Sequence, residues 1–160
     1  MTVLDPSLKQ DFRTALGHFA TGLCVLTSPG PAGMTVQSMM SLSLEPPLLA
    51  LGISRRSTLW EEVRHDGVFC LNLLRADQED LVWRFGSTPR TNRFDGVAWH
   101  PAPDGIPELA KAHAWIRCRM YAENDGGDHW LVVARVDALR LGVGDPLIFH
   151  RGRLGRLAGS

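Results

Sequence analysis

The sequence lacks the features that identify several large classes of protein. Its 160 residues carry 17 Lys and Arg against 17 Asp and Glu, whereas a nucleic-acid-binding domain normally has an excess of basic residues. No apolar run approaches the roughly 20 residues that span a bilayer. The opening residues, MTVLDPSLKQDFR, lack the basic-then-apolar order of a signal peptide. These absences predict a cytoplasmic protein that binds neither nucleic acid nor a membrane.

Cysteine and histidine are present, but they lack the spacings of a metal site. Cys24, Cys70 and Cys118 are far apart, and each lies in an apolar run with no C-x-x-C pair. The six histidines show neither H-x-H nor H-E-x-x-H spacing. We therefore expect no metal bound by a local motif, and we expect the cysteines to pack as small buried apolar side chains.

Few segments have the pattern of a helix. Apolar residues recur at helical spacing over residues 8–19 and predict a first helix. Thr58 and Glu61 have the spacing of a capping box, which predicts the start of a second helix. A third short helix is expected over residues 77–86, with Asp77 as its N-terminal cap.

The rest of the regular structure is predicted to be strand. Over residues 114–121, apolar side chains at even positions alternate with larger or charged ones at odd positions, the two-residue period of a strand. About seven strands with two or three helices that never alternate regularly favour an antiparallel sheet or barrel. No G-x-G-x-x-G fingerprint of a parallel dinucleotide-binding sheet is present. We expect a single domain over residues 1–160.

Three polar groups could carry chemistry. MTVQSMMS over residues 34–41 places hydroxyls and an amide in an apolar region, where they satisfy one another or bind a planar, hydrogen-bonding ligand. SRRST over residues 54–58 precedes a predicted helix, so it is either a simple cap or a phosphate site. Asp128 and His129 follow two glycines on a turn, where a histidine is more often a plain surface residue than a catalytic one.

Motifs of protein acid–base or nucleophilic catalysis are not recognisable. The chain has no G-x-S-x-G elbow and no recognisable Ser-His-Asp arrangement or pair of acids at a cleft. A redox cofactor would account for this, because the cofactor does the chemistry and the protein supplies orientation and electrostatics.

The chain resembles the short-chain flavin reductases, the reductase components of two-component flavin-dependent monooxygenases. From residue 12 to about residue 154 it contains, in the family's order, FRTALGHFATGLCVLT, MTVQSMMSLSLEPPLLAL, SRRSTLWEEV, GVFCLNLLRADQEDLVWRFG, GGDHWLVVARV and PLIFHRG. The resemblance implies a mainly β fold, an antiparallel Greek-key split β-barrel with a few short flanking helices, and a homodimer with flavin at or near the interface. It also implies NADH-dependent reduction of free FAD or FMN by hydride transfer to flavin N5, which supplies reduced flavin to a separate monooxygenase.

The resemblance also implies site residues. The isoalloxazine and ribityl groups would lie against Thr35, Val36, Gln37, Ser38 and Ser41, and the flavin phosphates against Ser54, Arg55, Ser57 and Thr58. Phe85 and Arg90 would lie along the rest of the flavin. Asp128 and His129 would face the nicotinamide, with His150, Arg151 and Gly152 as neighbours. The catalytic contribution of His129 would be to position the nicotinamide amide or close the pocket.

Three positions depart from the family pattern. Gln37 stands where Asn or Ser is frequent, Met39 where an aromatic residue is frequent, and Leu154 where the last motif often ends in Tyr. A missing aromatic ring could change how flavin or nicotinamide stacks. The family leans toward NADH, although Arg151 and Arg153 leave NADPH open.

Two other functions remain open at this stage. A flavin carrier or sensor would retain flavin without reacting with NADH, but it would have no need of the Gly-Asp-His turn. An FMN-dependent oxidase acting on an amine would need a more basic phosphate site than SRRST, together with ligands for its substrate.

Overall fold

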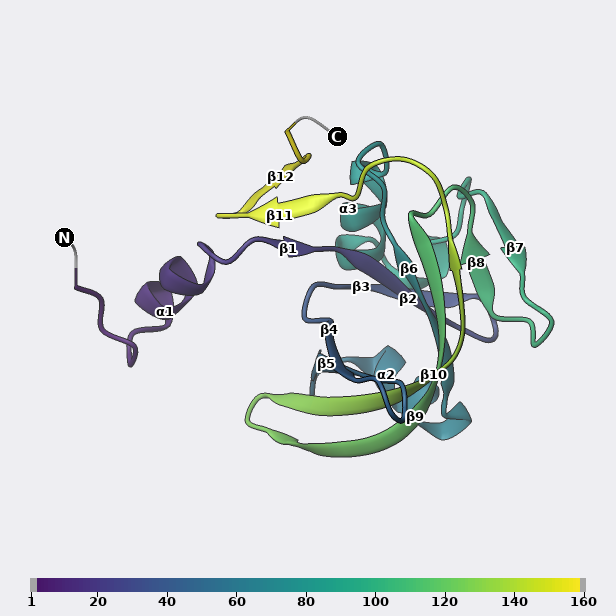
Figure 1. Cartoon of the computed structure of the whole chain (residues 1–160), viewed down its shortest axis with the longest axis horizontal. Helices are drawn as coiled ribbons and strands as arrows, with labels where there is room; N and C mark the ends of the chain where they lie inside the picture. Colours follow the sequence, from purple (N-terminus) through teal and green to yellow (C-terminus); the bar gives the residue numbers. More distant parts are fainter. Residues whose placement is uncertain (1–2, 159–160) are drawn as a thin grey trace.

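The computed structural model describes residues 3–158, and they form a mainly β protein with three α-helices (Figure 1). The helices are α1 (Lys9–Leu16), α2 (Thr58–Asp66) and α3 (Glu79–Ser87), followed by a short 3-10 helix, η1 (Arg90–Asn92). The expectation of a mainly β chain with a few short helices is confirmed. No helix in residues 3–158 is long and apolar enough to cross a membrane.

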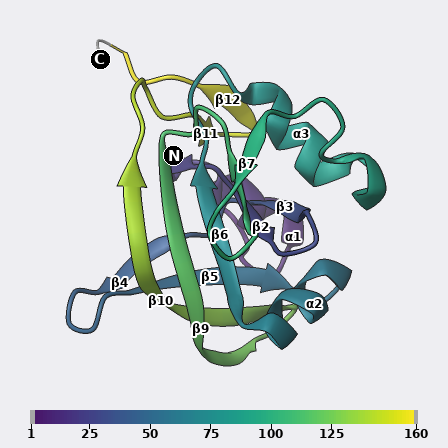
Figure 2. The ribbon, with the colours of Figure 1, turned by 90° about the vertical axis from the view of Figure 1, so that its right-hand side faces the viewer.

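The main sheet has seven antiparallel strands and is strongly curved (Figure 2). In spatial order they are β3 (Ala32–Val36), β2 (Cys24–Ser28), β6 (Val68–Leu73), β9 (Ala114–Gly126), β10 (His129–Leu141), β5 (Leu48–Ser54) and β4 (Met40–Ser43). The two edge strands, β3 and β4, follow one another in the chain, so a short loop connects opposite edges of the sheet. No ladder joins these edges within residues 3–158, and the observed sheet is therefore curved but not closed.

Two smaller sheets lie on opposite sides of this structure (Figure 1). One contains β1 (Thr21–Gly22), β11 (Ile148–His150) and β12 (Arg153–Gly155) and lies next to α1. The other is the hairpin of β7 (Trp99–Pro101) and β8 (Pro107–Leu109). The predicted first helix is shorter than its apolar pattern, and none of the α1 residues is buried.

The core fills the inner face of the curved sheet and the surface under α3. Leu51, Trp60 and Leu71 are fully buried in an apolar cluster that joins the main sheet to α2. The three cysteines are buried free thiols, as predicted. Burial raises the pKa of Cys24 and of Cys70 to about 12, so both remain uncharged at neutral pH.

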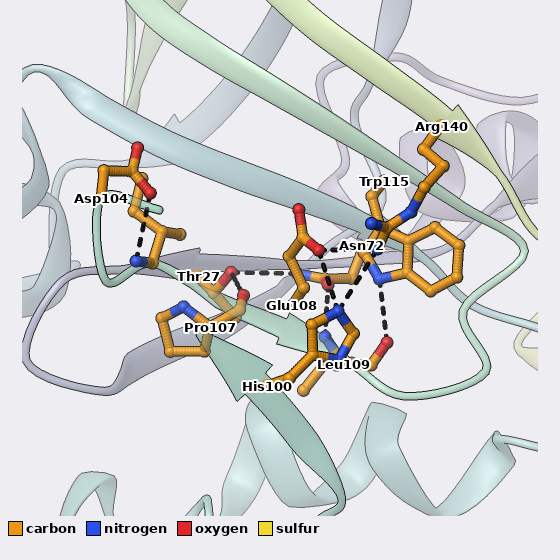
Figure 3. A network of polar contacts seen from close by, with 10 residues as sticks. Thr27, Asn72, His100, Asp104, Pro107, Glu108, Leu109, Trp115 and Arg140 are labelled. Atoms are coloured by element: carbon orange, nitrogen blue, oxygen red, sulfur yellow. Dashed lines mark hydrogen bonds and ion pairs between the residues drawn. The ribbon is translucent and has the colours of Figure 1, made fainter. Parts of the chain in front are cut away.

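A buried polar network attaches the β7–β8 hairpin to the main sheet (Figure 3). The Thr27 hydroxyl donates to the Pro107 carbonyl at 2.6 Å. The Asn72 amide donates to the Val25 carbonyl at 3.1 Å, and its oxygen accepts from the Leu109 N–H at 2.7 Å. Because these buried groups satisfy one another, the hairpin has a fixed place on the sheet.

The predicted N-terminal caps of α2 and α3 are wrong by one residue. The Ser57 hydroxyl, rather than that of Thr58, accepts from the Trp60 N–H at 3.2 Å, and the extended backbone of Ser57 makes it the cap of α2. Gln78 precedes α3, while the carboxylate of Asp77 pairs with Arg75 instead of the helix. Only α2 has a side-chain cap, because the Gln78 side chain makes no hydrogen bond to the start of α3.

Candidate active site

Two of the predicted site segments meet where β5 ends and β10 begins. Ser54, the last residue of β5, is the register partner of His129. The Arg55 N–H donates to the Asp128 carbonyl at 3.1 Å. The SRRST segment and the Gly-Asp-His turn are distant in sequence, and the antiparallel pairing of β5 with β10 brings them together.

The third predicted segment, residues 34–41, joins the junction of β5 and β10 through Ser38. Its hydroxyl donates to the Gly52 carbonyl at 2.7 Å and accepts from the Gly52 N–H at 2.9 Å. The loop between β3 and β4 is thereby held against β5, with Gln37 exposed and Ser41 exposed on β4.

The N-terminus of α2 carries polar and basic groups. Arg90 donates to the Thr58 hydroxyl at 3.3 Å and to the Glu62 carboxylate at 2.6 Å. The hydrogen bond from Arg90 holds the pKa of Glu62 below its ordinary value. Arg56 is exposed, and its side chain has no hydrogen-bond or ion-pair partner within residues 3–158. The sequence did not single out Arg56, because two adjacent arginines look alike until their partners are known.

Arg55 is engaged by the β9–β10 turn. Its Nε donates to the Gly127 carbonyl at 2.8 Å, and its Nη2 donates to the Asp125 carboxylate at 2.7 Å. Its guanidinium carbon lies 3.7 Å from the centre of the Trp130 ring. Asp125 and Trp130 were not predicted, since only the register of β5 on β10 places them beside Arg55.

His129 lies at the surface, paired with its neighbour. Its Nδ1 is 2.6 Å from the Asp128 carboxylate, and about half of the His129 side chain is exposed. The hydrogen bond to His129 holds the pKa of Asp128 below its ordinary value. Asp128 therefore fixes one ring nitrogen of His129, while Nε2 remains the one to contact a ligand.

Thr35, Val36 and Phe85 support β3 through their side chains. The Thr35 hydroxyl donates to the Val82 carbonyl of α3 at 2.8 Å. Phe85 is fully buried, and a side chain at Gly33 would meet its ring at 2.8 Å. Val36 borders a small, mostly apolar cavity of about 70 Å³ beside Gln37. Thr35 and Val36 could meet a ligand through the backbone of β3, whereas the buried ring of Phe85, on α3, packs against that strand.

His150, Arg151 and Gly152 lie apart from the other predicted residues. They form the turn between β11 and β12, where the Arg151 N–H donates to the Gly17 carbonyl at 2.8 Å. Arg151 and Gly152 have φ values of 51° and 76°, which make the turn tight. No hydrogen bond or ion pair within residues 3–158 joins this turn to His129, and Figure 1 shows the two hairpins on different sides.

The flavin reductase like domain family matches residues 16–158 of this chain. The chain belongs to this family. The reductase subunit HsaB of a Rhodococcus jostii flavin-dependent monooxygenase is 38% identical over 146 residues, which cover 89% of this chain and 74% of that protein. An FMN reductase (NADH) of Agrobacterium fabrum is 37% identical over 152 residues, 93% of this chain and 86% of that protein.

A solved structure of a flavin oxidoreductase has the same fold. The NADH:FAD oxidoreductase of Streptomyces globisporus, in complex with NAD and FAD fragments, is similar with a TM-score of 0.94 and 29% identity. The match covers 99% of this chain and 98% of that one. The family resemblance seen in the sequence is therefore confirmed.

Proposed function

We propose that this flavin reductase family member uses NADH to reduce free FAD or FMN and supplies the reduced flavin to a separate monooxygenase. The observation that carries the proposal is the junction of three segments, the β3–β4 loop, the start of α2 and the Gly-Asp-His turn. Family membership supports it, because the Rhodococcus relative is named a monooxygenase reductase subunit and the Agrobacterium relative an FMN reductase using NADH.

The start of α2 fits the phosphate of a flavin nucleotide. The first N–H groups of a helix have no partner within the helix and favour an anion. Arg56 adds a charge that no described residue neutralises, and Thr58 adds an exposed hydroxyl. Ser54 and Ser57 shape the segment, since the Ser54 hydroxyl accepts from the Arg56 N–H at 3.3 Å and Ser57 caps the helix.

The remaining groups would position the two rings. The bound nucleotides supply the chemistry, a hydride that passes from nicotinamide C4 to flavin N5. The exposed loop at Gln37 and Ser38 would offer backbone N–H groups to the polar edge of the flavin and stabilise the charge that develops there. His129, fixed by Asp128, would hold the nicotinamide in its reactive orientation.

The proposed assembly is a homodimer of single-domain, cytoplasmic Greek-key split barrels. Helix α1 supports this proposal, because it has no buried residue and exposes 50% of Phe12 and 57% of Leu16. Phe19, just after the helix, is 75% exposed. Exposed apolar side chains of this kind are typical of an interface, and a second copy of the chain would cover them.

The test is to mix the purified protein with NADH and excess free FAD or FMN. We expect the nicotinamide absorbance to fall faster than in a protein-free control. A protein that retains flavin through dialysis and leaves NADH unchanged would contradict the proposal and favour a carrier or sensor. Oxidation of an amine by bound FMN without NADH would favour an oxidase. Rates with the four flavin and nicotinamide combinations identify the preferred pair.

A further inference from the structure

We propose that Arg55 is a positioning residue that fixes the β9–β10 turn and thereby orients His129, and that it is not a ligand of the flavin phosphate. This inference rests on the proposed function, because it assigns a role within the proposed nicotinamide side of the site. It leaves Arg56 as the arginine of this segment that binds phosphate.

Arg55 contacts three of the four residues that precede His129. Its Nη2 pairs with Asp125, its Nε with the Gly127 carbonyl, and its backbone N–H with the Asp128 carbonyl. The second oxygen of Asp125 accepts from the Gly127 N–H at 2.8 Å. The turn is therefore closed by its own carboxylate and attached to β5 by Arg55.

The guanidinium also fixes the residue that follows His129. It stacks on Trp130 at 3.7 Å, and the guanidinium of Arg64, in α2, lies 5.0 Å from the same ring. Arg64 pairs with Glu123, which accepts from the buried Trp60 at 2.7 Å. Trp130, Arg64 and Glu123 therefore link Arg55 to α2 and to the buried Trp60.

A phosphate would have to compete with these partners. Two of the three guanidinium nitrogens of Arg55 and one of its faces are occupied. The hydrogen bond from Gly127, and then the charge of Arg55, hold the pKa of Asp125 below its ordinary value, so Asp125 is ionised at neutral pH. A phosphate placed at Arg55 would meet this negative charge, whereas the side chain of Arg56 has no hydrogen-bond or ion-pair partner within residues 3–158.

The experiment compares five variants of the 160-residue chain. They are Arg55→Ala, Arg55→Lys, Asp125→Asn, Arg56→Ala and the double variant of Arg55→Ala with Asp125→Asn. Because small displacements of an orienting group are costly in rate, Arg55→Ala should raise the KM for NADH on the order of tenfold and leave the flavin Kd nearly unchanged. Arg55→Lys should not restore the KM, because an ammonium group cannot bridge two acceptors and stack at once.

The matched controls separate positioning from phosphate binding. Asp125→Asn should raise the KM for NADH in the same direction, and the double variant should be no worse than Arg55→Ala, as expected for two members of one contact. Arg56→Ala should raise the flavin Kd, measured by fluorescence titration, more than the KM for NADH. Thermal melting curves identify any variant that fails to fold.

Three results would overturn the inference. The first is a flavin Kd that rises in Arg55→Ala as much as in Arg56→Ala, and the second is an equal loss in the KM for NADH and the flavin Kd. Hydrogen exchange gives a readout that does not depend on activity, with faster exchange expected in Arg55→Ala over residues 123–131 but not over α2. Unchanged exchange over residues 123–131 is the third. Failure of the wild-type protein to consume NADH would instead count against the proposed function alone.

Discussion

Two hairpins carry the residues predicted for the nicotinamide side, and the chain holds them very differently. The β9–β10 turn is attached to β5, to Arg55 and, through Trp130 and Glu123, to α2. The β11–β12 hairpin pairs with the two residues of β1, and the Arg151 N–H at its turn donates to Gly17. Its Phe149 and Leu154 pack against the buried cluster that contains Leu23 and Leu147. The first turn is therefore fixed by an ion pair and by β5, whereas the second has no ion pair within residues 3–158.

The difference bears on how the proposed site is completed. A group that must orient a ligand is most effective when its conformation is set before binding, and His129 meets this condition. His150 and Arg151 have fewer contacts, and in the proposed homodimer the second copy would cover the exposed apolar residues of α1 beside them. We therefore expect the His129 side of the proposed site to be formed in every copy of the chain. The side that contains His150 and Arg151 should form only in the dimer.

The largest expected effect comes from removing the support of the β9–β10 hairpin. Trp60→Ala deletes a fully buried ring and its hydrogen bond to Glu123. It should lower the free energy of unfolding by about 3–5 kcal/mol, measured by denaturant titration. Val3→Ala, at an 86% exposed side chain, is the control and should change it very little. A loss of stability in Trp60→Ala no larger than in the control would contradict the account of this core.

The next effect concerns the other hairpin. Phe12→Asp combined with Leu16→Asp places charges on the exposed apolar side chains of α1. If α1 is covered by a second copy, this change should weaken the dimer at least about tenfold, since burying either charge without a partner is unfavourable. Light scattering coupled to size exclusion measures the mass. A wild-type monomer, or a variant that remains fully dimeric, would show that α1 is not the interface.

A smaller effect distinguishes the hairpins by pH. The folded-state pKa values of Asp125 and Asp128 lie below the ordinary 3.8, so their contacts stabilise the turn above that value and are lost as the pH falls through the folded pKa. Hydrogen exchange over residues 123–131 should therefore be constant from neutral pH to about pH 5, after correction for the intrinsic rate, and should accelerate below about pH 4. Residues 148–155, in the β11–β12 hairpin, contain no Asp or Glu, so they should not show this acid-induced acceleration of exchange.

The Asp125→Asn variant is the control for this pH effect. It should already exchange faster at neutral pH and should show a smaller acid-induced increase. An acceleration of the same size in the variant and the wild-type protein would assign the change to other carboxylates.

Much of the fold could be predicted from local patterns, but the organisation of the site could not. The alternation over residues 114–121 predicted β9, because a strand that is buried on one face repeats every two residues. The apolar spacing of α1 predicted a helix correctly, yet it could not show whether the apolar side chains would be covered by the same chain. Periodicity reports which face is apolar, and it does not say what packs there.

The partners of Arg55 show the limit most clearly. The sequence and the family resemblance placed Arg55 and Arg56 in one basic segment, with Arg55 on the flavin phosphates. Only the register of β5 on β10 places Asp125, Gly127 and Trp130 around Arg55 and leaves Arg56 exposed. Such contacts join residues that are far apart in sequence, so no local motif could have predicted them.

The most direct test of the central claim is to replace His129 with Ala and to measure the KM for NADH and the flavin Kd on the same preparation. If the turn next to β5 positions the nicotinamide, the KM for NADH should rise on the order of tenfold while the flavin Kd is nearly unchanged. Equal losses in both quantities, or no change in either, would contradict this account of the site.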